Sequence, residues 1–140
     1  MIERFRAQGL KMTPQRAAVF GVLYDNPTHP SAESVHAAVV ADMPTVSLRT
    51  VYQTLNDLAE MGEIHRLEVG TGSARFDPNV EESHHHLVCD DCGMVRDLHV
   101  DLRARVTKGL ADTGDVPEGF DVLGADLIVR GRCRSCAQQV

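Results

Sequence analysis

The chain has 140 residues and a formal net charge of −6, from 14 basic and 20 acidic residues. Its length predicts one domain or two small ones, and its hydrophobic share of 43% is ordinary for a globular protein. It has neither a bilayer-length apolar run nor a signal-like N-terminus, so we expect a cytoplasmic protein without a membrane partner. The charge is uneven: residues 1–53 sum to +1 and residues 54–140 to −7. The acidic total therefore does not exclude an anionic partner for the N-terminal part.

The first half of the chain is typical of helices. Thr13, Ser31 and Ser47 are N-cap residue types, and each precedes a run of apolar residues at helical spacing. Proline or glycine follows where each run stops. Four helices are therefore expected, near residues 5–9, 14–25, 32–43 and 48–61.

Strand patterns begin after Gly62. Alternation over residues 63–69 and 74–77, around a glycine-rich turn, predicts a short hairpin. Helices followed by such a hairpin predict a winged helix-turn-helix domain over residues 1–78.

A second, smaller domain is expected after a linker at residues 79–83. Residues 84–140 contain two strand patterns (84–88 and 94–98), a helical pattern (100–110) and an alternating segment (120–129). So few elements form a marginal core, which favours stabilisation by a metal and a partner chain. The predicted fold class is α+β, a winged helix-turn-helix followed by a small α/β dimerisation domain.

Four cysteines form two CxxC pairs, Cys89 with Cys92 and Cys133 with Cys136. Two such turns can supply the four corners of a tetrahedron, which predicts a closed structural Zn²⁺ site. A cytoplasmic protein is not expected to hold a disulfide framework, and no βαβ pattern supports a thioredoxin-like redox motif. Four unrelated cysteines are the remaining interpretation.

Histidines and aspartates indicate a second metal site. His84 and His86 share one face if they lie on a strand, with His85 pointing away, and Asp97 follows on the next strand. Asp77 ends the hairpin. Spacing alone does not join these residues to His29, because an isolated histidine before a proline is usually a turn residue. A histidine run such as residues 84–86 is also often part of a surface loop or the remnant of a tag. His36, His65 and His99 are expected to face solvent or fill gaps.

Several motifs in order resemble one family. They are TPQR at 13–16, HPSAE at 29–33, SLRTVYQTL at 47–55 and HHHLVCDDCG at 84–93. Together they are similar to the ferric uptake regulator (Fur) family of bacterial metal-dependent repressors, from about residue 10 to residue 136. The resemblance implies a homodimer and a regulatory metal held by His29, Asp77, His84, His86 and Asp97. Fe²⁺ and Mn²⁺ suit this set of nitrogen and oxygen ligands.

Two features favour the peroxide-sensing (PerR-like) branch. Both carboxylate positions, Asp77 and Asp97, are aspartate, and no late histidine stands at residues 124–126 for a further family site. That branch implies iron-catalysed oxidation of His29 and His84 under oxidative stress, with the cysteines as bystanders. The alternative is a manganese, iron or zinc uptake regulator of the same family.

The fourth helix is the expected DNA-reading helix. Arg49 can reach phosphate or guanine, Tyr52 a thymine methyl, and Thr50 and Gln53 offer further polar groups. Lys11 and Arg16 suit phosphate or minor-groove contacts; the alternative for each of the six is an ordinary solvated surface residue. One ion bound by residues from both domains would fix the angle between them, so we expect the metal-bound dimer to repress from a palindromic operator.

Two other functions are disfavoured. A zinc hydrolase could use an open His–Asp site, but no HExxH-type motif or general base accompanies it. A metal-storage module would not need Arg49 and Tyr52 on a capped helix. The expected function is therefore regulatory rather than enzymatic.

Overall fold

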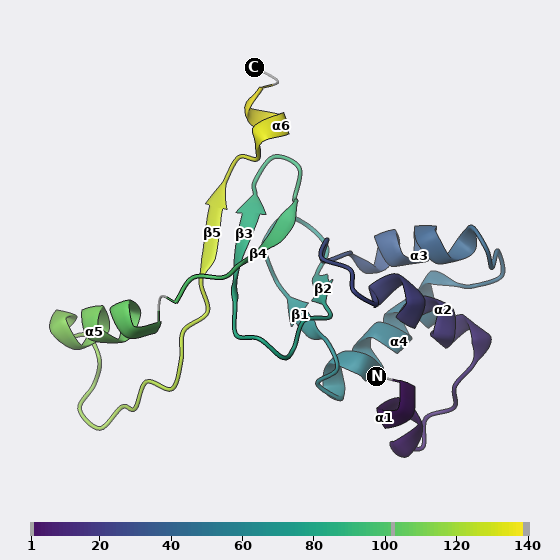
Figure 1. Cartoon of the computed structure of the whole chain (residues 1–140), viewed down its shortest axis with the longest axis horizontal. Coiled ribbons are helices and arrows are strands. Elements are labelled where there is room, and N and C mark those ends of the chain that lie inside the picture. The colour runs from purple at the N-terminus through teal and green to yellow at the C-terminus, as the bar shows by residue number, and fades with distance from the viewer. Residues whose placement is uncertain (1, 102, 139–140) are drawn as a thin grey trace.

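The computed structural model describes residues 2–101 and 103–138. Helices gather in the N-terminal part and strands in the C-terminal part (Figure 1). In chain order the elements are α1 (Ile2–Ala7), α2 (Pro14–Leu23), α3 (Ala32–Val40), α4 (Leu48–Glu60), β1 (His65–Leu67), β2 (Arg75–Asp77), β3 (His85–Cys89), β4 (Val95–Leu98), α5 (Arg103–Thr113), β5 (Ile128–Gly131) and α6 (Arg134–Ala137). None of the described helices is both long and apolar enough to cross a membrane.

Side-chain caps start three of the helices, as the sequence predicts. The hydroxyl oxygens of Thr13, Ser31 and Ser47 each accept a hydrogen bond from the backbone N–H three residues later, at 3.1–3.3 Å. The predicted end of α3, at residue 43, was wrong by three residues. The helix ends at Val40 because the chain then forms a tighter turn, in which the Asp42 N–H donates to the Val39 carbonyl. The first helix lies earlier than expected, at Ile2–Ala7.

One hydrophobic core holds α1–α4 together. Phe5 packs edge-on against Phe20, with ring centroids 5.2 Å apart. Phe76, on β2, is also buried in this core, so the β1–β2 hairpin is fixed to the helices. The hairpin strands are shorter than the predicted 63–69 and 74–77. The Glu63 N–H still bonds to the Leu58 carbonyl at the end of α4, and only residues 65–67 pair with β2.

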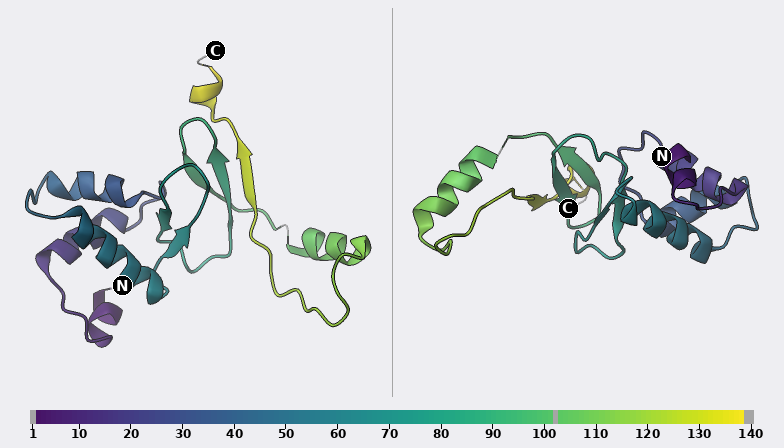
Figure 2. Two further views of the ribbon diagram at one scale, coloured as in Figure 1. Left: turned by 180° about the vertical axis from the view of Figure 1, so that it is seen from behind. Right: turned by 90° about the horizontal axis from the view of Figure 1, so that it is seen from below.

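The C-terminal part is built on a three-stranded sheet of order β4–β3–β5. β3 pairs antiparallel with β4 and parallel with β5. The predicted strand over residues 120–129 was mostly wrong, because only Ile128–Gly131 runs beside β3. The helix predicted over residues 100–110 lies at Arg103–Thr113 and projects away from the sheet (Figures 1 and 2).

The two parts of the chain contact each other through a second, smaller apolar cluster. Val69, in the loop of the β1–β2 hairpin, is buried against Val88 and Val95 of the three-stranded sheet. The Arg75 side chain also donates to the Gly93 carbonyl at 2.8 Å. A side chain at Gly93 would disturb this contact, because a Cβ there would lie 2.8 Å from the Arg75 guanidinium. The hairpin is therefore seated on the CxxC turn that carries Cys89 and Cys92.

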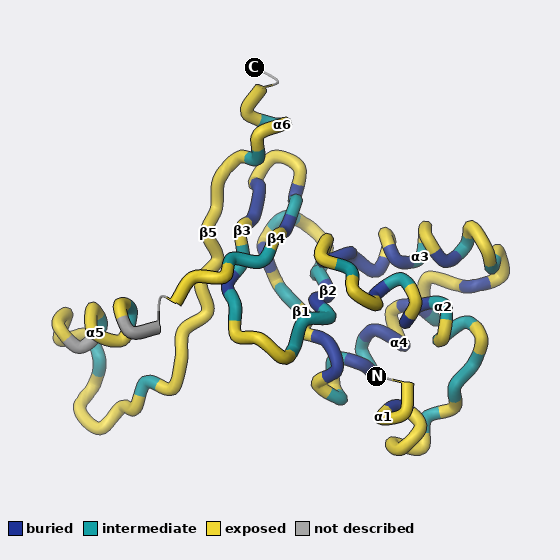
Figure 3. Tube along the Cα trace, in the orientation of Figure 1, coloured by how far each residue is buried: buried dark blue, intermediate teal, exposed yellow. Residues whose placement is uncertain are grey.

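Burial separates the parts of the chain (Figure 3). Buried residues line α2–α4 and lie towards both ends of β3, whereas α5, β5 and the segment between them are largely exposed. The structure thus places a well-packed helical unit beside a sheet with an open apolar edge.

Candidate metal centres and DNA-reading helix

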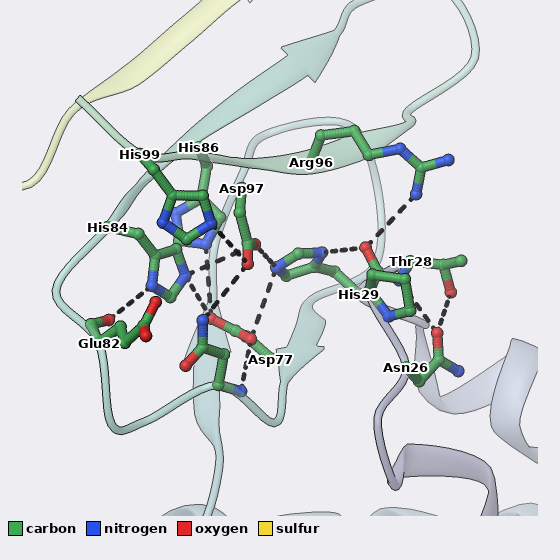
Figure 4. Close-up of polar contacts among 12 residues, drawn as sticks. Asn26, Thr28, His29, Asp77, Glu82, His84, His86, Arg96, Asp97 and His99 are labelled. Carbon is green, nitrogen blue, oxygen red and sulfur yellow. Dashed lines mark hydrogen bonds and ion pairs between the residues drawn. The ribbon is translucent and has the colours of Figure 1, made fainter.

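Five side chains from four separate segments converge between the two parts of the chain (Figure 4). The possible ligand atoms of His29, Asp77, His84, His86 and Asp97 all lie within 4.8 Å of one another. His29 stands in the turn before α3, Asp77 ends β2 and Asp97 lies on β4. The fold therefore brings His29 beside the other four residues, a proximity that their spacing in the sequence did not predict. Their role as metal ligands stays a prediction.

The nitrogen and oxygen atoms at the centre of this cluster are close together. Nε2 of His29 lies 2.8 Å from Oδ1 of Asp97 and 3.5 Å from Oδ1 of Asp77. Nε2 of His84 lies 2.9 Å from Oδ2 of Asp77, and Nε2 of His86 lies 3.5 Å from the same oxygen. Three imidazole nitrogens thus face two carboxylates.

Backbone carbonyls orient two of the rings. Nδ1 of His29 donates to the Pro27 carbonyl at 3.1 Å, and Nδ1 of His84 donates to the Glu82 carbonyl at 2.7 Å. Because Nδ1 carries the proton, the Nε2 lone pair of each neutral ring points into the cluster. We infer these tautomers from the hydrogen bonds.

Several atoms of the cluster are buried but unpaired. Nε2 of His29, Nε2 of His86 and Oδ1 of Asp97 lack hydrogen bonds of acceptable geometry in the described part of the chain. Buried polar atoms are normally paired, so these orphaned atoms indicate a missing partner. A divalent cation fits, because it accepts lone pairs from all three atoms at once.

The pKa shifts reflect the same crowding. Burial lowers the pKa of His29 more than Asp77 and Asp97 raise it. Burial also lowers the pKa of His84, but the Glu82 carbonyl with Asp77 and Asp97 outweighs it, so the net pKa is raised. Burial opposes the ionisation of Asp77, whose pKa is nevertheless lowered by the nearby His86 ring and the Asn79 N–H. A cation at the centre of the cluster would compete with the second proton, on Nε2, that His84 takes up when its ring becomes charged.

His85 lies outside this cluster, as the expected alternation along the strand predicts. Its side chain is buried, and Nδ1 accepts the Leu127 N–H at 3.3 Å.

Two further residues border the cluster and were missed by sequence reasoning. The Asn79 N–H donates to Oδ1 of Asp77 at 2.8 Å, and its side-chain amide lies 3.4 Å from Oδ2 of Asp97. Nε2 of His99 lies 3.8 Å from the same oxygen of Asp97. The Asp-Pro-Asn sequence, which is typical of a side-chain-capped turn, was the available signal for Asn79.

The four cysteines form a second cluster at the far end of β3 and β5. Their sulfur atoms lie within 4.8 Å of one another, and none is in a disulfide. Cys92 and Cys133 have sulfur atoms 3.8 Å apart, and the Cys133 N–H donates to the Cys89 sulfur at 3.2 Å. This arrangement fits a tetrahedral four-thiolate site.

Protons are unevenly shared among these thiols. The N–H of Cys133, together with other backbone donors, lowers the pKa of Cys89 to about 6, whereas hydrogen bonding to Cys133 and Cys92 raises the pKa of Cys136 to about 12. One sulfur therefore ionises first and suppresses ionisation of its neighbour. A cation of charge +2 would remove this conflict by stabilising all four thiolates.

The exposed face of α4 carries most of the predicted DNA contacts. Arg49 and Gln53 are exposed, Tyr52 is 37% exposed, and Thr50 is half-buried beside the Ser47 cap. Lys11 is exposed just before α2. The structure places these five on its surface, and their contact with DNA stays a prediction.

Acidic side chains hold several of these residues. Glu33 accepts a hydrogen bond from the Tyr52 hydroxyl at 2.6 Å, and Asp57 accepts one from the Gln53 amide at 2.7 Å. Arg16 is held more firmly: it pairs with Asp57 at 3.1 Å, donates to the Lys11 carbonyl and lies over the Phe5 ring. A DNA contact by Arg16 would require breaking bonds that join α2 to α4.

The chain resembles known proteins in both sequence and fold. The model of the Ferric uptake regulator family matches residues 7–117. The chain belongs to the ferric uptake regulator family. Members of this family are transcriptional regulators rather than enzymes, and they act as dimers that bind DNA operators.

Individual members of the Fur family extend the match to most of the chain. The peroxide-responsive repressor PerR of Staphylococcus aureus (strain Mu50 / ATCC 700699) is 30% identical over 135 residues, covering 96% of this chain and 88% of PerR. The ferric uptake regulator of Pseudomonas aeruginosa, solved with manganese, is 30% identical, with a TM-score of 0.66 over 94% of this chain and 96% of that one.

The fold is also matched by Helicobacter pylori Fur. It has a TM-score of 0.78 over 95% of this chain and 86% of that one, at 24% identity. The mixed helix-and-sheet architecture is thus that of Fur proteins.

Proposed function

We propose that this Fur-family chain is a metal-dependent transcriptional repressor that binds a palindromic operator as a homodimer and senses peroxide. The convergence of His29, Asp77, His84, His86 and Asp97 carries the proposal, because their donor atoms come from both parts of the chain. A cytoplasmic Fe²⁺ or Mn²⁺ ion is the regulatory ligand that suits three nitrogens and two oxygens.

The domain division follows from this site. Residues 1–78 form the winged-helix domain, residues 79–83 the linker and residues 84–140 the dimerisation and metal-binding domain. His29 and Asp77 lie on the winged-helix side of the linker, and His84, His86 and Asp97 on the other. A cation bound by both sets fixes the angle of each winged helix in the dimer. The two α4 helices then match half-sites at a fixed spacing, and DNA in turn tightens metal binding.

A structural Zn²⁺ held by Cys89, Cys92, Cys133 and Cys136 stabilises the second domain. It ties the chain after β5 to the turn between β3 and β4, where the hairpin is also seated. Much of the folding free energy of this domain is then zinc-binding free energy.

A second copy of the chain covers the open side of the sheet. β5 is an edge strand in the described part of the chain, and exposed apolar residues lie on it, on the segment before it, on β3 and just after β4. Exposed apolar side chains on neighbouring segments are typical of an association site. The residues are Leu87, Val100, Phe120, Leu123, Leu127, Ile128 and Val129.

Arg49 on α4 is the proposed main DNA contact. It stands in the first turn of the helix, and its guanidinium is the side-chain type that recognises guanine or phosphate. Lys11, Thr50, Tyr52 and Gln53 are the accompanying contacts.

Peroxide sensing is supported by the PerR relative and by the use of aspartate at both carboxylate positions. Ferrous iron, when bound, supplies the electron that turns peroxide into a local oxidant. His29 and His84 present ring atoms beside that centre, and a cleft of about 850 Å³ lined in part by His29, Asp77 and Asp97 gives a small oxidant access. An oxidised imidazole would lose its affinity for the metal, so the link between the domains opens.

Peptide mass spectrometry tests this. Full-length protein loaded with Fe(II) is treated with substoichiometric peroxide, and the Mn(II)-loaded protein is the control. We expect one added oxygen atom on the peptides of His29 or His84 in the Fe(II) sample alone, in step with loss of DNA binding. Loss of DNA binding with both histidines unmodified would contradict peroxide sensing by these residues.

The second candidate function is an uptake regulator without peroxide sensing. The manganese-bound P. aeruginosa relative, as similar in sequence as PerR, favours it. Metal-dependent DNA binding that survives peroxide with Fe(II) bound would select this alternative.

A further inference from the structure

Asn79 is the one residue of the expected linker that contacts both carboxylates of the proposed regulatory site. Its N–H donates to Oδ1 of Asp77 at 2.8 Å, and its side-chain amide lies 3.4 Å from Oδ2 of Asp97. Asp77 ends β2 and Asp97 lies on β4. Asn79 therefore links ligands that the fold brings from different parts of the chain.

The two oxygens of Asp97 have different surroundings. Oδ1 faces the imidazoles, 2.8 Å from Nε2 of His29 and 3.6 Å from Nε2 of His84, and it is buried without a hydrogen bond. Oδ2 faces the amide of Asn79, with Nε2 of His99 at 3.8 Å. Only Oδ1 is thus left to act as a donor at the centre of the cluster.

The two oxygens of Asp77 differ less in their surroundings. Oδ2 lies 2.9 Å from Nε2 of His84 and 3.5 Å from Nε2 of His86, while Oδ1 accepts the Asn79 N–H but also lies 3.5 Å from Nε2 of His29. The backbone N–H would remain in any variant at position 79. Substitution of Asn79 therefore isolates the effect of its side chain on Asp97.

We propose that Asn79 is a positioning residue that holds Asp97 to a single donor oxygen and so limits the regulatory site to five donor atoms. This rests on the proposed metal-binding function. A carboxylate binds through both oxygens only if both can turn toward the ion, and the amide of Asn79 holds Oδ2 outward. A metal that prefers six ligands would then keep one position that the protein does not fill. Asn79 also helps to line the cleft beside the cluster.

The choice of metal follows from the same constraint. Mn²⁺ favours six donors in octahedral geometry, whereas Zn²⁺ is satisfied by four or five. Without the amide, Asp97 is free to turn and supply a sixth donor, which fills the open position and favours Mn²⁺ over Zn²⁺. Asn79 thereby controls both metal preference and access for a small ligand.

Co(II) absorption spectroscopy of the full-length, zinc-loaded protein tests the proposal. The ligand-field absorption of Co(II) is much weaker with six donors than with five, and thiolate charge-transfer bands reveal any Co(II) at the cysteines. We compare wild type with the Asn79→Ala and Asn79→Asp variants. Aspartate has the same size as asparagine but lacks its donating amide group. Asn56→Ala is the control, because Asn56 lies on α4 and belongs neither to the cluster nor to the lining of its cleft.

We expect a five-donor spectrum for wild type and Asn56→Ala, and the weaker six-donor spectrum for both Asn79 variants. The Mn(II)/Zn(II) affinity ratio is expected to rise about tenfold in those variants, the lower range for removal of a ligand's hydrogen-bond partner. Circular dichroism identifies a misfolded variant. Unchanged spectra in both folded Asn79 variants would overturn the role of Asn79 and leave the metal site standing. Failure of wild type to bind Co(II) outside the cysteines would instead overturn the proposed function.

Discussion

The seating of the β1–β2 hairpin on the CxxC turn can be tested by Val69→Ala. Val69 is 1% exposed and packs against Val88 and Val95, which lie close in the chain to the cysteines proposed to bind zinc. The substitution deletes two methyl groups, each contributing about 0.8 kcal/mol by burial, and it leaves part of a cavity. We therefore expect the seated hairpin to lose about 2 kcal/mol of stability.

Hydrogen exchange measures this locally, because hairpin amides exchange whenever the hairpin leaves the sheet. A loss of about 2 kcal/mol raises their exchange rate about 25-fold. Val40→Ala makes the same deletion at a half-buried position of α3 and is the control. Removal of zinc by a chelator should accelerate the same hairpin amides. Equal exchange in the hairpins of wild type and Val69→Ala would refute the seating.

Three further predictions concern single side chains. Arg49→Ala should weaken operator binding by about 1–3 kcal/mol with metal content and dimer mass unchanged, and unchanged binding by fluorescence anisotropy would remove Arg49 from the DNA interface. The hydrogen bond to the Glu33 carboxylate raises the pKa of Tyr52 by stabilising the protonated phenol. In a Tyr24→Phe background, ultraviolet absorbance should therefore show that Tyr52 ionises at lower pH in the Glu33→Ala variant than with Glu33 present. Titration curves that coincide would exclude the bond. Cys136→Ser should lose zinc by atomic absorption, and one retained zinc per chain would contradict the four-thiolate site.

The helices and their beginnings could be predicted from the sequence because their causes are local. Thr13, Ser31 and Ser47 cap helices through bonds spanning three residues. The bounds of β5, the strand described after residue 120, could not be predicted, because β5 is defined by parallel pairing with β3, some forty residues earlier. Alternation over 120–129 carried no information about where that pairing begins.

The candidate sites also contain residues that local sequence patterns predict and residues that only the fold brings together. CxxC spacing is local and indicated a zinc site directly, whereas His29 joined the histidine–aspartate cluster only through family resemblance. Its distance of 2.8 Å from Asp97 arises from packing of the two parts of the chain. The contacts of Asn79 and Glu33 were missed because their partners lie 18 and 19 residues away.

Metal control of DNA binding is tested most directly by one titration series. Fluorescence anisotropy of a labelled A·T-rich palindromic duplex is recorded with metal-free regulatory sites and with Fe(II), Mn(II) or Zn(II), each with and without peroxide. We expect the regulatory metal to tighten binding by about 5–150-fold, the usual range of coupling between two sites. Peroxide should abolish the gain with Fe(II) alone. Equal affinity with and without metal would contradict the account.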